Sequence, residues 1–123
     1  MHTIRLRGPW EYRPASQPTA ALQRLKLPAD WASVASEEPE AFEFYRSFQM
    51  PTGIEAEDEI YLVLQQLPSA ELQLNGQPLG STTTDAAARF SIKQHLVQRN
   101  QLKITLSLTA NQPCNGEVAI QIE

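Results

Sequence analysis

Cysteine is nearly absent from this sequence, which has only Cys114 among its 123 residues. A single cysteine excludes an internal disulfide, so the fold cannot depend on an oxidising compartment. Long hydrophobic runs are missing too: no stretch approaches the roughly 18 apolar residues of a membrane-spanning helix, and the first ten residues lack the apolar core of a signal peptide. If Met1 is the natural start, we therefore expect a cytoplasmic protein with no membrane partner.

Basic clusters are also lacking. The sequence has 10 Lys and Arg against 14 Asp and Glu, with a net charge of −4 and a pI near 5.2. Because binding to phosphate groups requires clustered Lys and Arg, this charge pattern excludes nucleic acid as a partner. The hydrophobic fraction of 41% and the charged fraction of 20% are ordinary for a globular protein. A chain of this length can bury a sufficient core alone, so we predict one domain over residues 1–123.

Short stretches of alternating apolar and polar residues predict β-strands. In "FEFYRSFQM" (42–50), the three phenylalanines and Met50 share one face, with Arg46 in their midst, and Tyr45 has the opposite parity. The segments "LKITLSL" (102–108) and "EVAIQIE" (117–123) repeat the alternation and predict half-buried antiparallel strands. By contrast, "IYLVLQQL" (60–67) is apolar on both faces at its start, which predicts a central strand covered on both sides.

The clearest local signal is Asn75-Gly76 within "AELQLNGQPLG" (70–80). This dipeptide supplies the positive φ angles of a two-residue turn, so it predicts a β-hairpin. "RFSIKQHLVQRN" (89–100) predicts a short strand that ends in one helical turn, whereas the stretch from Pro14 to Pro28 is expected to be irregular. About seven or eight short strands result, and an antiparallel β-sandwich is the economical way to bury their apolar faces.

Four segments resemble a known family in their order and spacing: "LPADW" (27–31), "FYRSFQMP" (44–51), "EIYLVLQQLPSAELQLNGQPLG" (59–80) and "FSIKQHLVQRNQLKITL" (90–106). Together they are similar to the N-terminal sugar-binding domain of family 2 glycoside hydrolases, the group that includes β-galactosidases and β-glucuronidases. The resemblance implies an all-β jelly roll of the galactose-binding domain-like type.

The sequence departs from the family at two points that concern function. Where the family has a His and a Gly-rich loop beside the sugar pocket, this chain has "STTTDAAAR" (81–89). The family's two catalytic glutamates reside on a separate barrel domain, which 123 residues are too few to contain. Since glycoside hydrolysis needs two carboxylates held across the scissile bond, the resemblance implies a domain that is not an enzyme.

Candidate sugar-binding residues come from the aromatic side chains and from the four segments that resemble the family. A pyranose packs its C–H face on a flat ring, so Tyr45 and Trp31 are candidate stacking surfaces, although core packing is the competing role for Trp31. Arg46 and Asp30 are candidate hydrogen-bond partners. Arg46 could instead be structural, paired with a carboxylate inside the fold, because a buried guanidinium is costly without a partner.

The acidic stretch 55–59 raises the question of calcium, because hard cations bind clustered carboxylates. Its spacing does not match an EF-hand, so we expect a solvated loop and no metal or other cofactor.

Two functions stay open at this point. The first is a non-catalytic carbohydrate-binding module, which the resemblance and the aromatic residues favour. The second is a structural or protein-interaction domain that has kept the sandwich without a sugar site, which the replaced loop favours. The expected partner is accordingly a carbohydrate or another protein.

Overall fold

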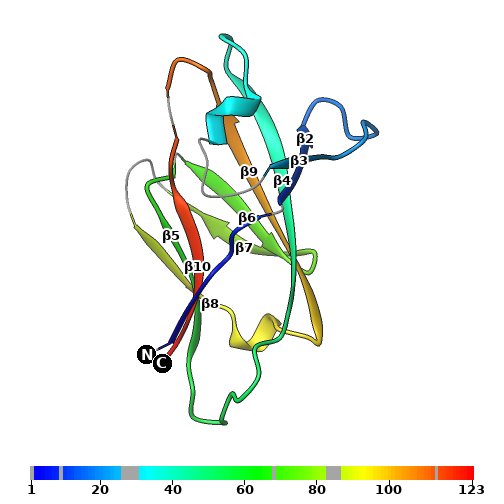
Figure 1. Ribbon diagram of the computed structural model, residues 1–123. Helices are drawn as coiled ribbons and strands as arrows, with labels where there is room; N and C mark the ends of the chain where they lie inside the picture. The colour runs from blue at the N-terminus through cyan, green and yellow to red at the C-terminus, as the bar shows by residue number, and fades with distance from the viewer. Residues whose placement is uncertain (1, 9, 26–30, 68, 83–86, 113) are drawn as a thin grey trace.

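Two antiparallel β-sheets pack face to face in the computed structural model, which describes residues 2–8, 10–25, 31–67, 69–82, 87–112 and 114–123 (Figure 1). The strands are β1 (His2–Arg5), β2 (Trp10–Pro14), β3 (Gln23–Leu25), β4 (Glu40–Gln49), β5 (Ile60–Gln65), β6 (Ala70–Leu74), β7 (Gln77–Ser81), β8 (Ala88–Ser91), β9 (Arg99–Leu108) and β10 (Glu117–Ile122). Two short 3₁₀ helices, η1 (Trp31–Val34) and η2 (Lys93–His95), lie between strands. The predicted all-β sandwich is confirmed.

The strand order shows how the sandwich is built. One sheet has the order β1-β10-β5-β8, and the other has the order β3-β2-β4-β9-β6-β7. The long strands β4 and β9 pair over ten residues at the centre of the larger sheet. The pairing of β1 with β10 brings the two ends of the chain together, as Figure 1 shows. None of the described helices is long and apolar enough to cross a membrane.

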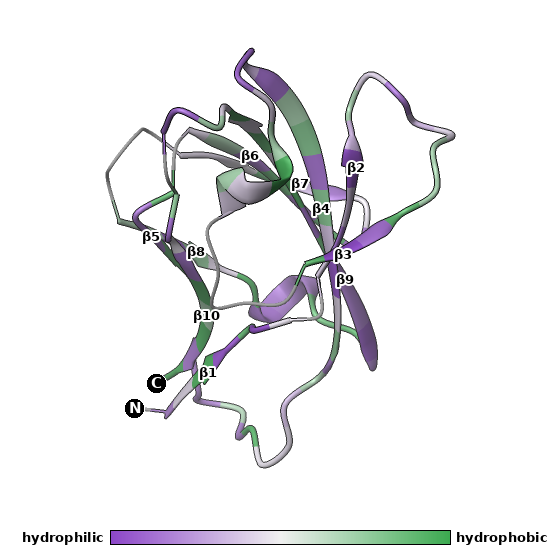
Figure 2. Cartoon of the chain, turned by 45° about the horizontal axis from the view of Figure 1, so that its top comes forward, coloured by the Kyte–Doolittle hydropathy of each residue, from purple (hydrophilic) through white to green (hydrophobic). Residues whose placement is uncertain are grey.

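Alternation along each strand produces the core. Figure 2 shows hydrophobic and hydrophilic residues following one another along β4, as a strand with one buried face requires. The fully buried side chains include Trp10, Trp31, Phe44, Ile60, Leu62, Leu64, Leu72, Leu74, Ile92, Leu102, Ile104 and Leu106. They come from both sheets, so one continuous core fills the space between the two layers.

The Asn75-Gly76 hairpin is confirmed. Leu74 pairs with Gln77, and the two turn residues have φ angles of 54° and 80°. Both values are positive, as the two-residue turn between twisted strands requires. The strand that follows, β7, lies at the edge of the larger sheet. Proline has no backbone N–H to donate, and an edge strand such as β7 is where a sheet tolerates it, as at Pro78.

Three expectations about strands were wrong. There are ten described strands and not seven or eight. The stretch 14–28, expected to be irregular, contains β3, whose three residues are too few and too polar to show an alternating pattern. Strand β5 is buried on one face only: Tyr61 and Val63 are half-buried on the outside, where the Arg89 guanidinium lies 3.5 Å from the centre of the Tyr61 ring.

Candidate functional site

The outward face of the six-stranded sheet is polar where β2, β4 and β9 run side by side. The register aligns Arg13, Glu43 and Thr105 in one row across these strands. The next row aligns Glu11, Tyr45 and Lys103. Residues opposite one another on neighbouring strands are close enough to interact, so the register alone brings charged groups and one aromatic ring together.

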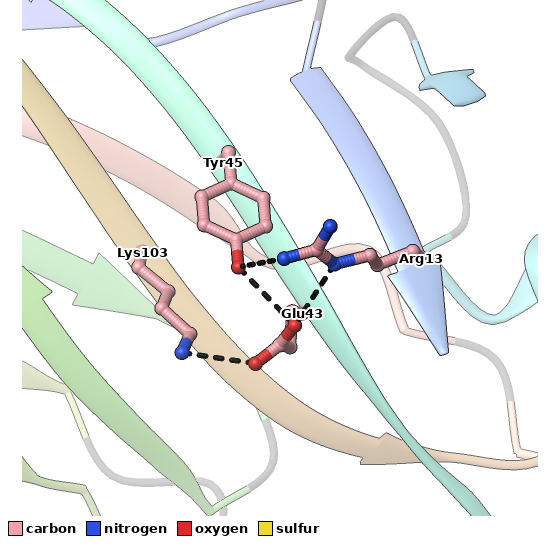
Figure 3. Close-up of polar contacts among 4 residues, drawn as sticks. All are labelled: Arg13, Glu43, Tyr45 and Lys103. Atoms are coloured by element: carbon pink, nitrogen blue, oxygen red, sulfur yellow. Dashed lines mark hydrogen bonds and ion pairs between the residues drawn. The ribbon is translucent and has the colours of Figure 1, made fainter. Parts of the chain in front are cut away.

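Four of these side chains form a connected group, which we call the Glu43 cluster (Figure 3). The Glu43 carboxylate pairs with Lys103 Nζ at 2.9 Å and with Arg13 Nε at 3.2 Å. The Tyr45 hydroxyl donates to Glu43 Oε1 at 3.1 Å and accepts a hydrogen bond from Arg13 Nη2 at 3.2 Å. The cluster therefore fixes the end of the Tyr45 side chain and takes up the one proton that its hydroxyl can donate.

The charges of the Glu43 cluster act on one another. Burial by itself raises the pKa of the Glu43 carboxyl, but the contacts from Lys103, Arg13 and Tyr45 outweigh it and hold this pKa below its usual value of 4.5. The hydrogen bond to Glu43 raises the pKa of Lys103 and of Arg13 in turn. Glu43 is thus held as an anion between two cations, and a carboxylate so held is poorly suited to donate or accept a proton in catalysis.

The lowered pKa of Glu43 predicts a pH-dependent contribution to stability. The unfolded chain takes up the proton first as the pH falls, so the contribution is complete above about pH 4.5 and is lost below it. We expect Glu43→Gln to lower the free energy of unfolding at neutral pH, and we expect the difference from the wild type to shrink as the pH falls below about 4.5. Urea unfolding of both proteins at several pH values measures this difference in the free energy of unfolding.

The matched control is Glu71→Gln, at an exposed glutamate on β6 of the same sheet that makes no ion pair among the described residues. Its stability should stay within about 0.5 kcal/mol of the wild type at every pH. A Glu43→Gln penalty that is the same at all pH values would contradict the assignment.

Beside the Glu43 cluster lies a hollow of about 230 Å³, which we call the Tyr45 hollow. Its lining residues are Glu11, Arg24, Tyr45, Arg46, Ser47 and Arg99. The hollow exists because the pairing of β2 with β4 ends at Tyr45, while β4 continues beside β9 as far as Gln49. Side chains from β2, β3, β4 and β9 therefore border a space that no strand fills.

Arg46 is the most firmly held cation of the Tyr45 hollow. Its Nε donates to the carbonyl oxygen of Arg7 at 2.9 Å, and its Nη1 donates to the carbonyl oxygen of Ser47. The side chain is half-buried, and this burial lowers its pKa below the usual value of an arginine. Arg46 is thus bonded to backbone carbonyls, and the carboxylate partner inside the fold that one interpretation expected is absent from the described residues.

The structure brings together two of the four predicted site residues, Tyr45 and Arg46. It corrects a third: Trp31 is fully buried, its Nε1 donates to the carbonyl oxygen of Gly116 at 3.0 Å, and its ring has no face open to a sugar. The fourth, Asp30, lies outside the described residues. Four residues of the hollow escaped the sequence analysis: Glu11, Arg24, Ser47 and Arg99. Only the register of distant segments brings them near Tyr45, and no local motif marks them.

A second hollow, of about 340 Å³, lies farther along the same sheet. Hydroxyl groups of Ser81, Thr82, Thr105 and Ser107 are among its lining. None of its lining residues is aromatic or basic. It therefore lacks the flat ring on which a sugar could stack.

The acidic stretch 55–59 makes bonds within the protein. The Glu55 backbone N–H donates to Asp58 Oδ2 at 2.8 Å, and Lys93 Nζ donates to the carbonyl oxygens of Ala56 and Asp58. Within the described part of the chain, no group of three or more His, Cys, Asp or Glu side chains is arranged to hold a metal ion.

No family model matches the chain, and none of the curated proteins matches it in sequence. Solved structures do. A β-glucuronidase from Bifidobacterium dentium has a TM-score of 0.72 and 20% identity, over 86% of this chain and 20% of that one. A β-D-mannosidase from Dictyoglomus thermophilum has a TM-score of 0.69 and 21% identity, over 89% and 16% of the respective chains. A β-glucuronidase from Ruminococcus gnavus has a TM-score of 0.75 and 14% identity, over 97% and 28%.

These matches decide the architecture. The fold is that of the N-terminal domain of family 2 glycoside hydrolases. The resemblance carried by the four sequence segments is thereby confirmed for the fold. The chain spans 16–28% of the length of these three enzymes, so it corresponds to one domain of each.

Proposed function

We propose that the chain is a non-catalytic carbohydrate-binding domain and that the Tyr45 hollow is its site. The observation that carries the proposal is the convergence of a half-buried aromatic ring and several polar side chains in one hollow. A ring that can stack on the C–H face of a pyranose, with hydrogen-bonding groups beside it, is the usual composition of a small polar ligand site. The relatedness of the fold to glycosidases supports the same proposal.

Different side chains of the Tyr45 hollow would make different kinds of contact with the sugar. The Tyr45 hydroxyl already donates its one proton to Glu43 and accepts from Arg13, so the tyrosine contributes mainly its ring. Sugar hydroxyls would bind instead to the side chains that border the ring, above all Arg46 and Ser47. Because the Glu43 cluster holds the ring in place before any ligand arrives, little conformational entropy is lost on binding.

The composition of the hollow supports a role without catalysis. Glu11 is the one carboxylate among its lining residues. Glu43, the carboxylate of the Glu43 cluster beside the hollow, is engaged by two cations. Glycoside hydrolysis needs one carboxyl group to protonate the leaving oxygen and another to act as nucleophile or base, and the Tyr45 hollow supplies no such pair.

Replacement of Tyr45 by alanine tests the proposal. We expect Tyr45→Ala to fold and to bind sugar about tenfold more weakly, because the stacking surface is lost while Glu43 keeps both of its cations. The measurement is a thermal-shift screen with monosaccharides and oligosaccharides, in calcium and in chelator, followed by titration with the best ligand. Calcium and chelator should give the same melting temperature.

The matched control is Tyr61→Ala, at a half-buried tyrosine that stacks with Arg89 on the other sheet. This variant should keep the wild-type sugar affinity. Equal losses in both variants, or an unfolded Tyr45→Ala protein, would show that the tyrosine is structural and that the site assignment is wrong.

A structural or protein-interaction domain is the second candidate. One observation favours it: the Tyr45 side chain is held entirely by partners of its own chain, as a purely structural residue would be. The absence of a thermal shift with every sugar in the panel would favour this candidate over the first.

A further inference from the structure

The Tyr45 hollow carries more positive charge than the rest of the molecule would suggest. Arg24, Arg46 and Arg99 line it, and Glu11 is the one acidic residue among the lining side chains. The whole chain, by contrast, has a net charge of −4. A concentration of cations on an acidic protein raises the local concentration of anions at that point.

These three arginines lack acidic partners among the described residues. The ion pairs among the described residues involve four other cations: Arg5, Arg13, Arg89 and Lys103. The register sets Glu11 opposite Arg24 on the neighbouring strand, but the two side chains do not pair. None of the three guanidinium charges is therefore neutralised by an acidic side chain of the described residues.

Arg46 is preorganised for an anionic ligand. Its Nε and Nη1 are committed to the carbonyl oxygens of Arg7 and Ser47, and its Nη2 makes no hydrogen bond to the described residues. Half-buried and held at two points, the guanidinium loses little freedom when it binds an anion. A carboxylate is the anion that suits the uncommitted Nη2, because a hydrogen bond between a guanidinium and an ionised oxygen is among the stronger ones that a protein makes.

We propose that the Tyr45 hollow recognises an acidic sugar, with the carboxylate of a uronic acid bound by Arg46 and supported by Arg24 and Arg99. This inference rests on the proposed function and adds the class of sugar. The ring of Tyr45 would contact the C–H face of the pyranose while the arginines neutralise its carboxylate. Neutral sugars would use the same ring but leave the three cations without a partner.

The test compares matched sugars by calorimetric titration of the whole chain: D-galacturonic acid with D-galactose, and D-glucuronic acid with D-glucose. Acetate serves as the carboxylate without a sugar. We expect at least one uronic acid to bind about tenfold or more tightly than its neutral counterpart and than acetate. Added salt should reduce this preference, because it screens the charges of the exposed Arg24 and Arg99.

Variants assign the preference to residues. Arg46→Gln should reduce the affinity for the uronic acid to about that for the neutral sugar. Arg24→Gln and Arg99→Gln change exposed residues, so both variants should fold. Each should reduce the affinity for the uronic acid by a smaller factor, and they provide the test if Arg46→Gln does not fold. Arg5→Gln is the control, because Arg5 lies on the other sheet and pairs with Glu117. It should bind the acidic sugar like the wild type.

The outcomes separate this inference from the proposed function. Equal binding of acidic and neutral sugars would overturn the acidic-sugar assignment and leave the carbohydrate site intact. Binding of acetate as tight as that of the uronic acids would also overturn it, since the hollow would then be a general anion site. Preference for the uronic acid that survives all three arginine substitutions would locate the site elsewhere and overturn the inference. No binding of any sugar would overturn both proposals.

Discussion

Replacement of Trp31 by alanine should lower the free energy of unfolding by about 3–5 kcal/mol, the largest loss we expect from any single substitution in this domain. Trp31 is fully buried. Its ring centre lies 5.2 Å from that of Trp10 and 4.9 Å from that of Phe44, both with edge-on geometry. Alanine would leave a cavity among these rings, and the rigid aromatic neighbours could not collapse to fill it.

A hydrogen bond adds to the loss. Trp31 Nε1 donates to the carbonyl oxygen of Gly116 at 3.0 Å, which ties η1 to the segment before β10. Gly116 itself lies close to the end of β5 and the residues after it, because a Cβ atom there would lie 2.5 Å from the Leu67 side chain and 2.7 Å from the carbonyl oxygen of Gln65. The alanine variant therefore removes both the packing of the ring and one anchor of the loop.

The measurement is equilibrium urea unfolding of the wild type, Trp31→Ala and Trp31→Phe. The phenylalanine variant keeps an aromatic ring and loses the hydrogen bond, so its penalty should be clearly smaller than that of alanine. Ser33→Ala, at an exposed position of η1, should stay within about 0.5 kcal/mol of the wild type. A loss below about 1 kcal/mol for Trp31→Ala would mean that this ring is not part of the core.

The two roles weighed for Trp31 show where sequence reasoning stops. Alternation predicted the buried face of β4 correctly, because Phe42 and Phe44 share a parity that any reader of the sequence can count. Trp31 lies in a short 3₁₀ helix, which has no such periodicity. Its burial depends on Trp10 and Phe44, residues from two other elements, so core packing and sugar stacking could not be told apart from the sequence.

The candidate site was predictable only in part for the same reason. Tyr45 and Arg46 are neighbours in the sequence and could be proposed together. Arg24 and Arg99 are separated from them by about 20 and 50 positions, and they reach the Tyr45 hollow through the pairing of β3 with β2 and of β9 with β4. The positive charge of the hollow is thus a product of the fold, whereas the sequence as a whole indicated an acidic protein.

Substitution of Asn100 should cause the second large loss of stability, because Asn100 is the one buried polar side chain among the described residues. Its Nδ2 donates to the carbonyl oxygens of Val97, at 2.9 Å, and of Phe48, at 3.4 Å. Its Oδ1 accepts from the Val97 backbone N–H and from Asn75 Nδ2, both at 2.9 Å. Asn75 is the first residue of the hairpin turn, so one amide joins the end of β4, the loop before β9 and the hairpin.

We expect Asn100→Ala to lower the free energy of unfolding by about 2–4 kcal/mol, because four partly buried hydrogen bonds are lost at once. Asn111→Ala, at an exposed loop position, is the matched control and should change stability by less than about 0.5 kcal/mol. Urea unfolding measures both, and amide hydrogen exchange locates the effect. The Val97 amide should lose protection first, because Asn100 Oδ1 is its acceptor, whereas the Gln101 amide keeps its bond to Asn75 Oδ1. If instead the Val97 amide kept its protection in Asn100→Ala, this side chain would not be what organises the loop, and the predicted cost would lose its physical basis.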